Sequence, residues 1–282
     1  MESRENKDIS KELNIEKYKE DAILLEKAKE KMLEMGLFDK DFINSLNFVF
    51  IDAFEKDGEY QEVGYHLTED GSIVSYNNED SDRTKEVGVV TLSLLGKIDQ
   101  FFDIHNDKNK SQHIWLGNLD KSVFLSFDAA GAHEIAHTKS YGAITREKES
   151  LFDEEKFKEL VIKLIENDPV LSKDESVDFL KFNYSDENWS ELYALLYHRE
   201  FLRRENSDND KMIKEWDNHI IEVANDLQGA MKKFNQEKNT NIDPEVIYKD
   251  GHAFSFLLAR VFEEKYKDFN ERIKVLESCK KE

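Results

Sequence analysis

The sequence has one cysteine, a shortage of positive charge and no long apolar run. Cys279 excludes an intramolecular disulfide, so we expect a fold without covalent cross-links. There are 40 Lys and Arg against 61 Asp and Glu, which gives a formal net charge of −21. That charge repels phosphate backbones and argues against nucleic acid as a partner. No stretch reaches the length that a membrane span needs, so we expect no membrane span.

The N-terminal segment 1–21 is charged and lacks the apolar run of a signal peptide. We therefore expect a soluble protein that is cytoplasmic or exported by a signal-independent route, for instance into a host cell. Hydrophobic residues make up 39% of the 282 residues and aromatic residues 11%, which is enough apolar surface for a large core. The sequence does not fix an oligomeric state.

Strand patterns come first along the chain and helical patterns come last. Short runs rich in β-branched and aromatic residues predict strands over 46–53, 64–67, 72–76, 113–116 and 122–127, and residues 88–95 fit a strand that runs into a short helix. Apolar residues at helical spacing predict helices over 10–35, 132–141, 153–167, 186–204, 208–234 and 244–274. This order favours an α+β fold, with an N-terminal, mostly antiparallel sheet and a helical C-terminal part.

Residues 133–137 read His-Glu-Ile-Ala-His, the HExxH pattern of zinc peptidases. Residues four apart on a helix lie one above the other, so His133 and His137 can offer both imidazoles to one Zn²⁺. Glu134 lies about 100° around the helix, near enough to take a proton from a metal-bound water. We expect Ile135 and Ala136 to pack the rear of this helix into the core.

A catalytic zinc usually takes three protein ligands, so a third ligand is needed downstream. The candidates are the side chains of His198, His219, His252 and the carboxylates of residues 183–194. Glu191 is preferred, because it lies inside a helix that begins near residue 185, and Ala194 allows that helix to pack closely on the first. Glu187 is the alternative ligand, with Ser190 and Glu191 then orienting the ligands.

The two motifs together resemble the catalytic domain of anthrax lethal factor and the related Pro-Pro endopeptidases. The matching positions are His133, Glu134, His137, Tyr184, Glu191 and Ala194. The resemblance covers about residues 113–204 and implies a gluzincin-type zinc metallopeptidase with a zincin-like fold. It implies that Glu191 is the third ligand and that Tyr184 donates a hydrogen bond to the oxyanion or the substrate carbonyl. Leu195 departs from the pattern, because an acidic residue often stands at that position.

We expect a zinc-dependent endopeptidase that hydrolyses a peptide bond in a protein or peptide substrate. The resemblance implies a bacterial effector or toxin protease. The alternative is an inactive helical interaction module in which HExxH is accidental or decayed. The predicted parts are an N-terminal amphipathic helix in 1–40, a zincin-like catalytic core over 41–205 and a C-terminal helical region, 206–282, packed on that core.

Two further features carry weaker expectations. His252 is either a substrate contact or a structural or capping residue. The aromatic residues Trp189, Tyr193 and Tyr197 are spaced four apart, which is typical of the buried face of a helix.

Overall fold

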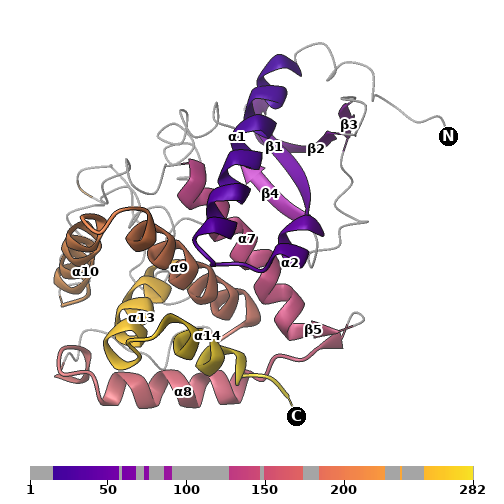
Figure 1. The fold of residues 1–282 in the computed structure, drawn as a ribbon. Helices are drawn as coiled ribbons and strands as arrows, with labels where there is room; N and C mark the ends of the chain where they lie inside the picture. Colours follow the sequence, from indigo (N-terminus) through magenta and orange to yellow (C-terminus); the bar gives the residue numbers. More distant parts are fainter. Residues whose placement is uncertain are drawn as a thin grey trace.

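The computed structural model describes residues 15–56, 59–67, 73–75, 86–90, 127–146, 149–173, 184–225, 236 and 251–281. The first half of this part of the chain contains two helices and four strands: α1 (Ile15–Glu34), α2 (Lys40–Asn44), β1 (Asn47–Lys56), β2 (Glu59–Leu67), β3 (Ile73–Ser75) and β4 (Glu86–Val90). The rest consists of helices and short strands: α7 (Phe127–Ile144), β5 (Thr145–Arg146), β6 (Glu149–Ser150), α8 (Glu154–Glu166), the 3-10 turn η4 (Leu171–Lys173), α9 (Asp186–Glu205), α10 (Asn209–Asn225), α13 (Gly251–Lys265) and α14 (Phe269–Glu277) (Figure 1).

The four longer strands follow the order β3-β2-β1-β4, in which β1 is antiparallel to β2 and parallel to β4. The two-residue strands β5 and β6 pair with each other. In Figure 1, α8 lies on the side of the molecule away from β1 to β4. The predicted strand over 113–116 and nearly all of the one over 122–127 lie outside the described residues, and Phe127 begins helix α7.

The predicted fold class, α+β with an N-terminal, mostly antiparallel sheet and a helical C-terminal part, is wrong. Of the residues whose side chains the structure describes, 77% are helical. Among residues with described side chains, the buried core comes from helices and the short segments that join them. The physical reason is that the helices bury one another's apolar faces, so helix-on-helix packing organises the core.

Helix α9 lies at the centre of the helical packing, in contact with α7, α10, α13 and α14. Trp189 and Tyr193 are fully buried and Tyr197 is nearly so, which confirms the prediction that these aromatic residues belong to the core. Their rings follow one another at centroid distances of 5.2 and 5.1 Å. The Trp189 indole donates a hydrogen bond to the Leu276 carbonyl at 3.0 Å, which ties α14 to α9.

Side-chain caps set several helix starts. Ser185 accepts a hydrogen bond from the backbone N–H of Asn188 and begins α9, close to the predicted boundary. Asp153 caps α8 in the same way. The single helix predicted over 244–274 is wrong, because Asp268 caps a new helix, α14, after α13 has ended at Lys265. Residues 226–250, apart from 236, lie outside the described residues, as does that part of the helix predicted over 208–234.

Helix α1 packs against α7 at a point of close approach. A Cβ atom added at Gly131 would meet the Met32 Cε atom at 3.3 Å, so the end of the Met32 side chain would have to shift by a few tenths of an ångström. Ala129 and Ala132 flank the contact and are fully buried. These small residues lie inside α7, which begins five residues before the predicted start at 132.

Candidate metal centre

Helices α7 and α9 pack against each other and bring the two sequence motifs together. The rear of α7 is buried as expected, since Ile135 and Ala136 have no exposed surface. Ala194 of α9 is also fully buried, consistent with a close approach of the two helices. The opposite face of α7 presents His133 and His137 toward Glu191.

Three ligand-type atoms converge between the helices. His137 Nε2 lies 3.1 Å from His133 Nε2 and 3.1 Å from Glu191 Oε2. The third side of the triangle, from His133 Nε2 to Glu191 Oε2, is 3.6 Å. Two imidazoles and a carboxylate are the donor set of many catalytic zinc sites. Glu191, the preferred third ligand, is therefore brought together with both histidines.

The size of this triangle fits a tetrahedral zinc ion. Ligand atoms bound to zinc at about 2.0 to 2.1 Å in a tetrahedral arrangement are about 3.3 Å apart. The observed separations of 3.1, 3.1 and 3.6 Å lie on both sides of that value. Small side-chain rotations are thus enough for His133, His137 and Glu191 to bind one ion.

The group is buried on the carboxylate side and open on the imidazole side. The Glu191 side chain is 5% exposed, whereas His133 and His137 are 16% and 23% exposed. Glu134 is half-buried on the same helix as the histidines. The two imidazoles are therefore more accessible to solvent than the carboxylate.

The side chains of two serines, Ser140 and Ser190, form hydrogen bonds with His137. Its Nδ1 atom lies 2.9 Å from the Ser190 hydroxyl, and Ser190 is hydrogen-bonded to the Ser140 hydroxyl. Ser140 donates to the backbone carbonyl of His137 at 2.7 Å. Ser140 was not among the predicted site residues, although its position three residues after His137 on the helix was a usable signal.

His198 lies beside the group on α9. Its ring is edge-on to that of His133, with the centroids 5.7 Å apart, and it is 2% exposed. Burial, together with the neighbouring His133, lowers the pKa of His198 to about 3, so this imidazole is neutral at pH 7. His198 was a candidate third ligand in the sequence, but it lies outside the group that converges on His137.

The remaining predicted residues lie elsewhere or outside the described side chains. Tyr184 is buried just before α9, with its ring edge-on to Phe157 of α8 at a centroid distance of 6.0 Å. Glu187, the alternative ligand, is exposed in the first turn of α9. The side chains of His219 and His252 lie outside the described residues.

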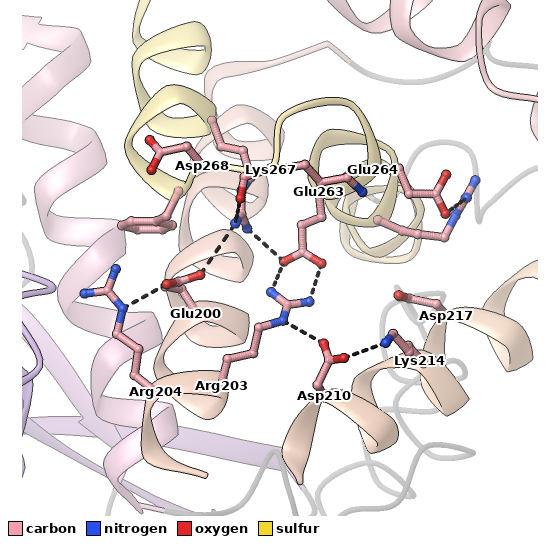
Figure 2. Close-up of a pocket in the computed structure, with 13 residues that line it drawn as sticks. Glu200, Arg203, Arg204, Asp210, Lys214, Asp217, Glu263, Glu264, Lys267 and Asp268 are labelled. Carbon is pink, nitrogen blue, oxygen red and sulfur yellow. Dashed lines mark hydrogen bonds and ion pairs between the residues drawn. The ribbon is translucent and has the colours of Figure 1, made fainter. Parts of the chain in front are cut away.

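A second polar cluster lies at a hollow of about 540 Å³ formed by α9, α10, α13 and α14, and all of its members except Arg199 line that hollow. We call it the ion-pair cluster: Arg199, Arg203 and Arg272 with Glu200, Asp210, Asp217 and Glu263. Figure 2 shows the two terminal guanidinium nitrogens of Arg203 pointing at the Glu263 carboxylate, at 2.5 and 2.6 Å. Arg199 and Arg272 reach the same carboxylate at 2.7 and 3.1 Å.

The charges of the ion-pair cluster satisfy one another. Both terminal nitrogens of Arg199 also bind Asp217, each at 2.8 Å. Burial alone would raise the pKa of Glu263, but Arg199 and Arg203 outweigh burial and hold that pKa at about 2. A carboxylate held by three guanidinium groups joins helices and is not set up to bind a ligand.

No protein-family model, curated protein or solved structure matches the chain significantly. The resemblance to the lethal factor family therefore stays a prediction from short motifs. Among the helices of the described residues, none combines the length and the apolar character that crossing a bilayer requires.

Proposed function

We propose that the protein is a zinc-dependent endopeptidase whose metal ligands are His133, His137 and Glu191. The proposal is supported above all by the convergence of two imidazole nitrogens and one carboxylate oxygen from two different helices. The spacing of these atoms suits a zinc ion, and the two imidazoles are partly exposed. Glu191 comes from a segment 54 residues after His137, so the convergence depends on the fold and not on local sequence.

The chain's own residues divide the work of peptide hydrolysis. Bound zinc supplies a Lewis acid that polarises a carbonyl and lowers the pKa of water. Glu134 accepts the proton that the attacking water loses and delivers it to the nitrogen of the leaving amine. The resemblance implies that Tyr184 donates a hydrogen bond to the oxyanion, but its ring is buried against Phe157 of α8, so the structure lends this role no support. The buried Glu191 carboxylate offsets part of the cation's charge.

The test compares the parent protein with Glu134→Gln. Both are incubated with a mixed peptide library, with and without a chelator, and products are identified by mass spectrometry. We expect cleavage by the parent that stops with chelator and returns with zinc. Glu134→Gln should keep about one zinc per chain while cleavage falls by about 10² to 10⁴-fold, the usual contribution of a general base.

The control is Glu149→Gln, at an exposed position of β6, which should change neither zinc content nor cleavage. Parent-like cleavage by Glu134→Gln would reject the proposed role of Glu134. A parent protein with neither stoichiometric zinc nor chelator-sensitive cleavage would instead favour the interaction module. The proposed setting, a bacterial effector or toxin protease acting on a protein partner, rests on the resemblance alone, and the library products would give the first information on specificity.

A further inference from the structure

Three hydrogen bonds form a closed loop that starts and ends at His137. Its Nδ1 atom contacts the Ser190 hydroxyl at 2.9 Å, and the Ser190 and Ser140 hydroxyls are bonded to each other. The Ser140 hydroxyl also contacts the His137 carbonyl at 2.7 Å. Both serines are fully buried, so water does not compete for these groups.

The loop fixes the position of each hydrogen. A backbone carbonyl only accepts, so the single hydroxyl hydrogen of Ser140 goes to His137 O. The bond between the two serines then needs the hydrogen of Ser190, which leaves the Ser190 oxygen as an acceptor toward His137. His137 Nδ1 must therefore carry a proton and donate it to Ser190.

This assignment determines what His137 offers to the metal centre. A neutral imidazole with its proton on Nδ1 has its lone pair on Nε2. That Nε2 atom is the one that lies 3.1 Å from both His133 Nε2 and Glu191 Oε2. The opposite tautomer would place a proton where a cation would bind, and it would leave two hydroxyl oxygens facing each other as acceptors.

We propose that Ser190, held in place by Ser140, is a positioning residue that fixes the tautomer and ring orientation of His137 for cation binding. The inference rests on the proposed metal site and adds to it two residues, Ser190 and Ser140, that orient the ligand His137. Partners that orient a metal-bound histidine typically contribute about 10- to 100-fold to metal affinity. Ser190 is next to Glu191 in the chain, so one turn of α9 supplies both a ligand and the group that orients another ligand.

The experiment measures zinc affinity by competition with a chromogenic chelator, which needs no catalytic activity. Ser190→Ala should weaken zinc binding by about 10- to 100-fold. Ser140→Ala should weaken it less, because Ser190 keeps its contact with His137. The double variant should bind zinc like Ser190→Ala, because removing Ser190 already breaks the loop. Because Ser140 and Ser190 are in contact, their effects are non-additive in either case; a purely structural role would instead lower stability to urea and leave the zinc affinity of the folded protein at the parent value.

The matched control is Ser255→Ala. Ser255 is also fully buried and bonded to a carbonyl, that of Asn188 at 3.4 Å, but it belongs to α13 and lies outside the loop. It should leave zinc affinity unchanged within about twofold. Nitrogen-15 NMR of the zinc-free parent should find His137 protonated at Nδ1, and Ser190→Ala should lose that preference.

The outcomes separate the two proposals. If the parent and Ser190→Ala bind zinc equally tightly, the inference about Ser190 is overturned, but the proposed metal site is not. A parent without stoichiometric zinc overturns both. If Ser190→Ala does not fold, the comparison of Ser140→Ala with Ser255→Ala decides, and equal zinc affinity in those two variants overturns the inference.

Discussion

Helix α9 carries two buried polar clusters that differ in how their charges are balanced. Toward its N-terminal end, Glu191 meets His133 and His137, and three ligand-type atoms converge with no arginine or lysine among them. Toward its C-terminal end, Arg199 and Arg203 meet Glu263, and opposite charges pair directly. The first cluster offers three ligand-type atoms to a cation, whereas in the second the opposite charges bind each other directly.

The comparison shows that burial and charge alone do not identify a site. Both clusters are polar, both lie on the same helix and both join segments that are far apart in the sequence. The ion-pair cluster lies at a hollow of about 540 Å³, yet its guanidinium and carboxylate groups already bind one another. The metal centre is distinguished by the converging nitrogen and oxygen atoms of its side chains.

The largest expected effect comes from changing the charge of the metal centre. Glu191→Gln keeps the volume of the side chain but removes its negative charge, and a neutral amide oxygen is a weaker zinc ligand. We expect zinc affinity to fall by more than the roughly 100-fold that loss of an orienting partner costs. Zinc content after dialysis and peptide cleavage report the loss.

Glu187→Gln is the control for this change, because Glu187 lies on the same helix but is exposed. Its zinc content should stay at the parent level. If Glu187→Gln lost zinc and Glu191→Gln kept it, the assignment of the third ligand would be reversed.

In the ion-pair cluster we expect an effect on stability and not on metal binding. Glu263→Gln leaves the buried Arg199 and Arg203 without their shared anion, and breaking a buried pair costs about 3 to 5 kcal/mol. Urea unfolding should detect this loss, while zinc affinity of the folded protein stays at the parent value. In the control Glu264→Gln, the side chain is 52% exposed, and we expect a change below about 1 kcal/mol. Equal stabilities of the two variants would contradict the structural role of the cluster.

Local patterns were enough to predict the two helices of the candidate metal centre and the three side chains that converge there. The spacing of His133 and His137 and the boundaries of α9 follow from rules that act within a few residues, and those rules led to Glu191. The capping role of Asp268 follows a similar local rule, but the apolar spacing on both sides of Asp268 predicts one continuous helix over 244–274.

The fold class and the ion-pair cluster could not be predicted in this way. Arg199 and Glu263 are 64 residues apart, and nothing near either residue indicates its partner. The fold class depends on which apolar faces pack together, which is a property of the whole chain and not of any one segment. The hydrogen bond between Ser190 and His137, 53 residues apart, is hidden for the same reason.

The smallest expected effect is the pH dependence of the ion-pair cluster. The pKa of Glu263 is about 2 in the folded protein against an ordinary value of 4.5, so the unfolded chain binds its proton first as pH falls. The contribution of Glu263 to stability is therefore complete above about pH 4.5 and is lost as pH falls toward 2. By pH 3.5 the loss should be on the order of 1 kcal/mol. Urea unfolding between pH 7 and 3.5 should give a steeper decline for the parent and Glu264→Gln than for Glu263→Gln. Parallel declines in all three proteins would mean that the three arginines do not hold Glu263 ionised.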